Sequence, residues 1–275
     1  MLSIRNRFPR KGTELATETT PELPSWTSLA RDLEEWQRPM EITLIRHAQP
    51  DWEPDESAVD EPTLTPHGLL QAERTAEALR GEHYDALYIS PMRRARETAA
   101  PIASALDLKP VVLSWMREIQ LPPLQGSTPE QVQAFFREGR LRSPDSWWNG
   151  FEGGESFRHF WERVSGGLDS LLTGDHAMDI HEDKEHRLWH VPNWDARILL
   201  VAHEGTNSVC VSHLLGVPPN PWTPLRFSVA WTGITRLHTT SLGSGAVWSL
   251  ESFNRTEHLR DLGGPTDGRP PKRVT

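Results

Sequence analysis

The sequence predicts an α/β fold of three layers, in which helices cover both faces of a mostly parallel central sheet and a small cap segment is added. Apolar runs with the length of strands alternate along the chain with segments of helical spacing, as in layered α/β domains. Two of these runs, residues 42–45 and 198–202, are apolar almost throughout. That pattern is typical of parallel strands buried on both faces. Each run is followed closely by a histidine.

A helix is expected to follow the first buried strand. Thr65 can cap its N-terminus and Pro66 suits its first position. Apolar residues at positions 69, 72, 76 and 79 then follow helical spacing. The other elements expected in this half are a strand over 84–89 that ends at Ser90-Pro91, a helix through Ala105 and a strand over 110–115.

Two more helix starts are expected in the second half of the chain. Ser127–Glu130 begins one helix, and Gly154–Ser156 begins a longer one that runs to about Leu172. The buried strand that ends at Ala202 is followed by a helix over 206–215. Three edge strands, partly antiparallel, are then expected over 227–231, 234–238 and 246–253.

The chain is expected to form one domain over residues 41–260. An N-terminal extension over 1–40 mixes Pro, Thr, Glu and Arg and contains one short helix around 28–37. Residues 261–275 are rich in Gly, Pro and Arg and are expected to form a flexible C-terminal tail.

Composition excludes several classes of partner. The formal net charge of the 275 residues is -9, which argues against nucleic acid and against an anionic membrane surface. No signal peptide and no run long enough to cross a membrane is found. Cys210 is the single cysteine, so an intrachain disulfide and a cysteine-rich metal site are excluded. These features predict a cytoplasmic protein.

His47 and His203 each follow a predicted buried strand. In open α/β sheets ligands bind just past the carboxyl ends of such strands. The two histidines are therefore expected to meet at one mouth, although they lie far apart in sequence. Arg46 brings a permanent positive charge beside the first histidine. This combination predicts a site that handles a phosphate group on imidazole.

Several segments extend this pattern into an ordered set. Leu44–Ala48 resembles the Arg-His-Gly signature of the histidine phosphatase superfamily, in its phosphoglycerate mutase-like branch. Ser90–Ala99 resembles that family's Ser-x-x-x-Arg-Ala-x-x-Thr-Ala segment, and Val201–Thr206 is similar to its second-histidine segment. Further segments of this chain also resemble landmarks of the family. They are Arg117-Glu118, Leu124–Gly126, Gly153–Phe157 and Asn254–Leu259. The resemblance covers roughly residues 41–260.

The resemblance implies a metal-independent phosphomonoesterase without a cofactor, since arginines supply the positive charge. His47 would be the nucleophile, which the flanking cations keep deprotonated, and His203 would stabilise the charge that develops. Glu118 would protonate the leaving alkoxide and then activate water. Residues implied in substrate binding are Arg46, Arg94, Gln49, Glu204 and Gly205, with further donors from the helix N-termini after Ser90 and Gly205.

Some assignments leave alternatives open. Arg93 and Arg96 compete with Arg94 for one role, and Asp51, Glu53 or Glu204 could replace Glu118 as the acid. The chain also departs from the family pattern. Ala48 and Glu204 stand where glycine is usual, while Pro50 and Glu53 stand where many members carry phosphate-binding Ser/Thr and Asn.

Two other segments each have a structural and a functional interpretation. The stretch 175–195 holds His176, His181, His186 and His190 among acidic residues, but without a tight ligand spacing, so a solvated loop is favoured over a metal site. Trp147 and Trp148 would either pack the cap on the domain or form an aromatic wall for a leaving group.

Three functions remain. The leading hypothesis is hydrolysis of a small-molecule phosphate ester through a phosphohistidine. The first alternative is a cofactor-dependent phosphoglycerate mutase, which usually carries a longer basic insertion than residues 127–154 provide. The second is a non-catalytic phospholigand-binding protein on the same fold. The sequence leaves open whether the chain forms a homodimer.

Overall fold

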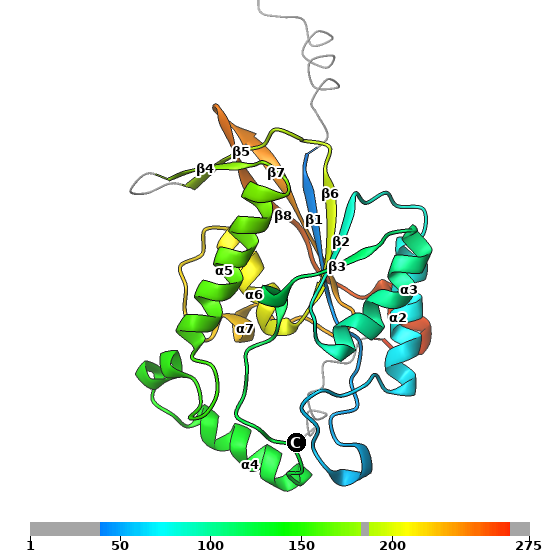
Figure 1. The fold of residues 1–275 in the computed structure, drawn as a ribbon, viewed down its shortest axis with the longest axis vertical. Coiled ribbons are helices and arrows are strands. Elements are labelled where there is room, and N and C mark those ends of the chain that lie inside the picture. The colour runs from blue at the N-terminus through cyan, green and yellow to red at the C-terminus, as the bar shows by residue number, and fades with distance from the viewer. Residues whose placement is uncertain (1–38, 183–186, 265–275) are drawn as a thin grey trace, which may run out of the picture. The chain divides into compact units, whose positions relative to one another are not determined.

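The computed structural model describes residues 39–182 and 187–264, which contain one eight-stranded sheet (Figure 1). The strand order across this sheet is β3-β2-β6-β1-β7-β8-β5-β4. The strands are β1 (Glu41–Arg46), β2 (Ala86–Ile89), β3 (Pro110–Val112), β4 (Asp179–Glu182), β5 (Arg187–His190), β6 (Arg197–Ala202), β7 (Ile234–Leu242) and β8 (Gly245–Arg255).

Helical segments lie between most of these strands, and one follows the last strand. The α-helices are α2 (Pro66–Leu79), α3 (Arg93–Leu106), α4 (Pro129–Arg140), α5 (Phe157–Gly174), α6 (Glu204–Leu214) and α7 (Thr223–Arg226). Short 3₁₀ segments are η1 (Pro54–Glu56), η2 (Ser114–Met116), η3 (Pro144–Asn149) and η4 (Glu257–Leu262). Within the described ranges, no helix is both long and apolar enough to cross a bilayer.

The sheet is parallel in its core and antiparallel toward one edge. Strands β3, β2, β6 and β1 pair in parallel, and β7, β8, β5 and β4 continue the sheet with antiparallel pairs. The predicted parallel core and the partly antiparallel later strands are thus confirmed. The antiparallel half is larger than expected because β4 and β5 join it.

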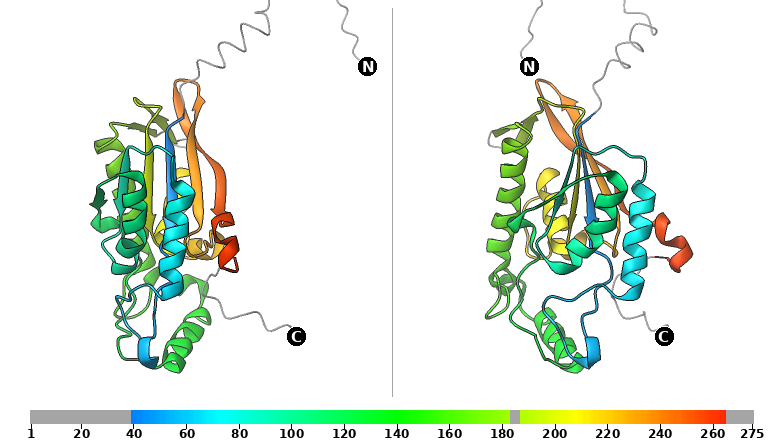
Figure 2. Two further views of the ribbon diagram at one scale, coloured as in Figure 1. Left: turned by 90° about the vertical axis from the view of Figure 1, so that its right-hand side faces the viewer. Right: turned by 45° about the vertical axis from the view of Figure 1, so that its right-hand side comes forward.

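Helices cover both faces of the sheet, which confirms the three predicted layers. Alternate residues of β6 point to opposite cores: Leu200 belongs to the core with α5 and α6, and Leu199 belongs to the core with α2 and α3. Figure 2 shows α5 on one side of the sheet and α2 on the other. Buried positions on both faces explain why the centres of β1 and β6 are almost entirely apolar.

The predicted helix starts are confirmed by their caps. The Thr65 hydroxyl accepts from the backbone N–H of Gly68, with Pro66 in the first turn of α2. Thr128 begins α4 in the same way, and Ser156 begins α5. One position on α2 differs from expectation: Leu69 is 49% exposed, because the buried face of the helix is formed by Ala72, Ala76 and Leu79.

Residues 227–231 do not form the predicted edge strand. Val229, Ala230 and Trp231 are buried, but their backbone is irregular and turns at Thr232, whose φ is 54°. The edge of β1 that faces away from β6 is paired with β7, so this apolar segment has no place beside β1 in the sheet. It lies instead against Arg46, whose guanidinium donates to the Val229 carbonyl.

The predicted solvated loop over 175–195 is also wrong, because β4 and β5 form a hairpin there. Trp189 is only 2% exposed and pairs with Ala246 of β8, which fixes the hairpin to the edge of the sheet. Its apolar contact outweighs the polar composition around it. Figure 1 places the hairpin at the opposite end of the sheet from α4.

Other boundaries shift by a few residues. The strand expected over 110–115 ends at Val112 and continues as η2, while α6 begins at Glu204, directly after His203. The helix expected around 28–37 and the tail from residue 265 lie outside the described residues. The domain boundaries of the chain stay predictions.

Candidate active site

The parallel core brings the two predicted histidines together. In the register of β1 and β6, Arg46 lies opposite Ala202, so the residue after each strand is a histidine. The rings of His47 and His203 have centroids 5.1 Å apart, and their side chains are buried. Ser90 follows the neighbouring strand β2 and reaches the same place. Three strand ends therefore supply one polar cluster.

Hydrogen bonds set the tautomer of His47. Its Nδ1–H donates to the Ala48 carbonyl at 2.8 Å, which leaves the Nε2 lone pair directed at Arg94. The Arg94 Nε–H lies 3.2 Å from that Nε2. Burial first, and then the charges of Arg94 and Arg46, hold the pKa of His47 well below its ordinary value. The ring is thus neutral and has one nitrogen suited to attack an electrophile.

His203 is held by Ser90. The Ser90 hydroxyl lies 2.7 Å from His203 Nε2 and also accepts the Met92 N–H. Where the serine donates to Nε2, the proton of the neutral ring is on Nδ1. This buried Nδ1 has no hydrogen-bond partner within the described residues. Burial also holds the pKa of His203 well below its ordinary value, with Arg94 adding to the effect.

Arg94 comes from the first turn of α3 and is 3% exposed. Its guanidinium lies 4.8 Å from the ring of Trp52, and its Nη1 has no hydrogen-bond partner in the described part of the chain. Burial lowers the pKa of Arg94 to about 10, which still leaves it charged at neutral pH. Its neighbours Arg93 and Arg96 are exposed. Among the three arginines, Arg94 therefore lies at the histidine.

Arg46 is paired with Glu204. Their side chains approach to 3.1 Å, and the Ser228 hydroxyl donates to the other oxygen of Glu204 at 2.8 Å. The guanidinium of Arg46 also lies 5.8 Å from the Trp231 ring. The carboxylate at the position where the family pattern has glycine thus lies on one of the two arginines predicted to bind phosphate.

Glu118 lies at the N-terminus of α6. One of its oxygens accepts the Gly205 N–H at 2.8 Å and the other accepts the Ile119 N–H at 3.0 Å. Burial raises the pKa of Glu118, while these donors and Arg94 oppose the rise. The Gly205 N–H is thus engaged by the Glu118 carboxylate, and the role of Gly205 in substrate binding stays a prediction. A carboxyl group with a raised pKa beside the histidines suits proton transfer.

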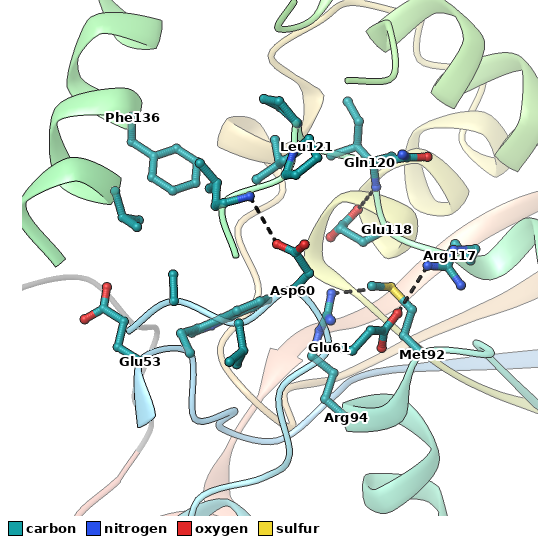
Figure 3. Close-up of a pocket in the computed structure, with 18 residues that line it drawn as sticks. Glu53, Asp60, Glu61, Met92, Arg94, Arg117, Glu118, Gln120, Leu121 and Phe136 are labelled. Carbon is teal, nitrogen blue, oxygen red and sulfur yellow. Dashed lines mark hydrogen bonds and ion pairs between the residues drawn. The ribbon is translucent and has the colours of Figure 1, made fainter. Parts of the chain in front are cut away.

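A cavity of about 670 Å³ opens beside this cluster (Figure 3). Arg94 and Glu118 line it, together with Met92, segments 52–53, 58–61 and 117–124, and two side chains of α4, Val132 and Phe136. Figure 3 shows Arg94 and Glu118 on one side of the cavity, Glu53 and Phe136 on the other, and Asp60 between them. The cavity therefore extends from the charged cluster toward α4, which belongs to the cap, the segment between Glu118 and Glu155.

The remaining predicted residues lie around this centre. Gln49 uses its backbone: its N–H donates to Gln71 and its carbonyl accepts from Thr65. Glu53 lines the cavity, whereas Trp147 and Trp148 do not. Trp148 packs on the ring of Phe157, which agrees with the packing interpretation for this residue, whereas Trp147 lies near the Arg142 guanidinium.

Sequence reasoning missed several side chains. Trp52 and Phe136 supply the aromatic surface of the cavity, and no periodic pattern marked them. Thr98 accepts the Ala48 N–H at 2.9 Å and thereby fixes the turn that carries His47. The sequence places Ser90 at the end of the predicted strand 84–89 but does not predict that its hydroxyl contacts His203. Within the described ranges, no group of three or more His, Cys, Asp or Glu residues could hold a metal ion.

Comparison with known families agrees with this geometry. A sequence model of the histidine phosphatase superfamily (branch 1) matches residues 42–255. The chain belongs to this family. Membership confirms the predicted resemblance and the expected class of enzyme, a histidine phosphatase.

Relatives of this phosphatase differ in their named activities. It is 29% identical over 183 residues to a wheat (Triticum aestivum) 2-carboxy-D-arabinitol-1-phosphatase, covering 64% of this chain but only 32% of that protein. It is 28% identical to phosphoserine phosphatase 1 of Hydrogenobacter thermophilus, covering 65% and 77%. It is also 28% identical to a probable phosphoglycerate mutase of Yersinia enterocolitica, covering 80% and 95%.

Solved structures show the same fold. A mycobacterial glucosyl-3-phosphoglycerate phosphatase superposes with a TM-score of 0.60 at 24% identity, covering 79% of this chain and 99% of that one. A phosphoserine phosphatase of Entamoeba histolytica, in complex with 3-phosphoglyceric acid, has a TM-score of 0.55 at 24% identity, covering 80% and 99%. These likenesses confirm the α/β fold.

Proposed function

We propose that this enzyme hydrolyses a small phosphomonoester through a phosphohistidine on His47, without a metal ion. The observation that carries the proposal is the state of the His47 ring. Its Nδ1–H is fixed by Ala48, and its Nε2 lone pair lies 3.2 Å from the Arg94 guanidinium. A neutral nucleophile beside a buried cation suits attack on an anionic phosphoryl group.

In the first step the phosphate group takes the place in front of His47 that the Arg94 Nε–H now occupies. The Nε2 lone pair forms a bond to phosphorus while the bond from phosphorus to the alcohol oxygen breaks. Arg46, Arg94 and the Nδ1–H of His203 stabilise the charge on the phosphoryl oxygens. Glu118 gives its proton to the departing oxygen, so that an alcohol leaves.

In the second step water hydrolyses the phosphohistidine. Glu118, now ionised, takes a proton from the water as its oxygen bonds to phosphorus, and the bond from phosphorus to Nε2 breaks. Inorganic phosphate leaves, and both His47 and Glu118 return to their starting states. Arg94 carries its positive charge at neutral pH, since its pKa of about 10 is well above 7. Protein cations thus provide the charge that a metal ion supplies in other phosphatases.

Hydrolysis of an aryl phosphate in the presence of EDTA tests this proposal. We expect activity to survive the chelator, to vanish in His47→Ala and to persist in the control His83→Ala, whose side chain is 79% exposed. Quenching with labelled substrate should trap a phosphoryl group that is stable in base, labile in acid and located on His47. A label on Ser90 or Glu118, or activity that returns only with a divalent ion, would contradict the mechanism.

Phosphoglycerate mutase activity is the second candidate, because a probable phosphoglycerate mutase aligns over 80% of this chain. The charges in the cavity favour hydrolysis instead. Glu53, Asp60 and Glu61 line it, and carboxylates there oppose a substrate with a second anionic group. Incubation with 3-phosphoglycerate and a bisphosphoglycerate primer separates the two: rapid 2-phosphoglycerate formation with little free phosphate would favour the mutase.

A non-catalytic phospholigand-binding role predicts a different result. Wild-type protein would then bind phosphate esters without releasing phosphate, and His47→Ala would leave the affinity nearly unchanged.

We further propose that residues 41–260 form the phosphatase domain, which contains the family match over 42–255, and that the enzyme acts in the cytoplasm on a small-molecule ester.

A further inference from the structure

The cavity beside His47 has two chemically different ends. Arg94 is 3% exposed, lines the cavity and has an Nη1 without a hydrogen-bond partner in the described residues. Glu118, the proposed proton donor, lines the same side. The ester oxygen must lie between these two groups if the mechanism holds. The rest of the cavity, toward Glu53 and Phe136, is then left for the alcohol part of the substrate (Figure 3).

The wall of this second part is largely apolar. Leu121, the two prolines that follow it and Leu124 form one side, and Val132 and Phe136 of α4 form another. Phe136 is 40% exposed and Trp52 is 42% exposed, although both line a cavity. Large exposed apolar groups in a concave site are stabilised when a ligand removes them from water. This wall therefore fits a hydrophobic or aromatic alcohol.

The volume points the same way. About 670 Å³ is in the range of cavities that hold a drug-sized ligand, well above the need of a three-carbon acid. A small sugar acid or amino acid would leave most of the apolar wall in contact with water. A bulky alcohol would cover it.

Charge in the second part of the cavity is negative. Arg117 lies at 3.2 Å from Glu61, so these two charges pair with each other. Asp60 accepts the Leu124 N–H, and the Glu53 carboxylate has no hydrogen bond or ion pair with any described residue. Within the described ranges, the only cationic residues that line the cavity are Arg94 and Arg117. A positive group on the alcohol would be attracted here, and a carboxylate would be repelled.

We infer that the cavity selects phosphomonoesters of a hydrophobic alcohol that carries a positively charged amine remote from the phosphate, with Glu53 and Asp60 as the specificity residues. This inference rests on the proposed function, since the phosphate end is assigned by it. It separates this enzyme from phosphatases whose named substrates carry a carboxylate, such as phosphoserine phosphatase.

Three phenyl phosphates test the inference. They carry an aminoethyl, an ethyl or a carboxyethyl group at the para position, and the two-carbon spacer keeps their leaving groups nearly equal. We expect kcat/KM to fall in the order amine, ethyl, carboxylate, with about tenfold between the first and the last. Equal or faster hydrolysis of the carboxyethyl ester would overturn the inference.

Variants locate the effect. Glu53→Gln should lower the amine-to-ethyl ratio of kcat/KM by about threefold, whereas the control Glu56→Gln, an exposed residue of the same loop that does not line the cavity, should leave it unchanged. Phe136→Ala should raise KM for the phenyl phosphate with the para-ethyl group more than for methyl phosphate. Leu141→Ala, 81% exposed and outside the cavity, is its control. Equal ratios in both carboxamide variants would remove Glu53 from the specificity role.

Binding separates this inference from the proposed function. Calorimetry of the three esters on His47→Ala measures affinity without turnover. If wild type hydrolyses none of the esters but the variant binds them in the same order, the proposed function fails and the specificity stands. If wild type hydrolyses all three without preference and the variant binds them equally, the specificity fails and the proposed function stands.

Discussion

The Glu118 carboxylate accepts the backbone N–H of Gly205 at 2.8 Å, and a Cβ atom on Gly205 would lie 2.4 Å from a Glu118 oxygen. Position 205 must therefore be glycine for the proposed proton donor to keep its place at the N-terminus of α6. The contact ties an acid on an irregular segment to the helix that begins directly after His203. This hydrogen bond, together with the one from the Thr206 hydroxyl to the Arg117 carbonyl, holds the donor near the second histidine.

Gly205→Ala should displace the Glu118 carboxylate and lower kcat for an alkyl phosphate by about a hundredfold, as expected when a general acid is misplaced. The same change on a Glu118→Gln background should add little, because the acid is already absent. Gly166→Ala is a suitable control, since a Cβ there meets nothing within 4 Å. Additive losses in the double variant would show that Gly205 acts on another group.

Glu118→Gln should slow substrates with poor leaving groups more than those with good ones. An alkoxide needs a proton as it departs, whereas a nitrophenolate leaves with little protonation. We expect a loss of about a hundredfold or more on an alkyl phosphate and less than tenfold on a nitrophenyl phosphate. Steady-state kinetics on both substrates measures the difference. Equal losses would point to Asp51, Glu53 or Glu204 as the acid.

The pH profile should follow from the two shifted groups. His47 must be neutral to attack, and its pKa lies well below the ordinary 6.5, so activity should persist below pH 6.5. Glu118 must be protonated, and its pKa lies above the ordinary 4.5, so alkyl phosphate hydrolysis should extend above pH 4.5 before it declines. Profiles of kcat/KM check this. The alkaline decline should be absent in Glu118→Gln; if it persists there, another group causes it.

The sequence predicts the core of this site because the strand pattern and the chemistry coincide. Residues 42–45 and 198–202 are apolar almost throughout, which predicts buried parallel strands before any contact is known. The carboxyl ends of such strands meet at one edge, so His47 and His203 could be placed together. Glu118 has no such signal, because it follows η2 on an irregular segment, and only the family resemblance identified it.

The walls of the cavity could not be predicted in the same way. Trp52 and Phe136 come from segments far apart in sequence and line one cavity because the loop before α2 contacts the segment before α4, where the Ala58 N–H donates to the Ser127 carbonyl. Segment 227–231 has the composition of a strand but is buried as irregular chain, because β7 already occupies the edge of β1. The β4–β5 hairpin depends on one buried side chain, Trp189, within a polar stretch. Each error involves a long-range contact that outweighs a local pattern.

Glu204 should weaken phosphate binding through Arg46. Its carboxylate lies 3.1 Å from the guanidinium, so a phosphate that uses the same arginine would lie only a few ångströms from a negative charge. The Glu204 side chain is 27% exposed, and solvent screening reduces the repulsion to on the order of 1 kcal/mol. Glu204→Gln removes the charge, while its amide oxygen can still accept from Arg46 and preserve the orientation of the guanidinium.

We expect the inhibition constant for inorganic phosphate to fall about fivefold, since 1.4 kcal/mol corresponds to about tenfold. Glu162→Gln, an exposed position on α5, should leave that constant unchanged. Weaker inhibition in Glu204→Gln would mean instead that the carboxylate is required to hold Arg46 in its phosphate-binding position.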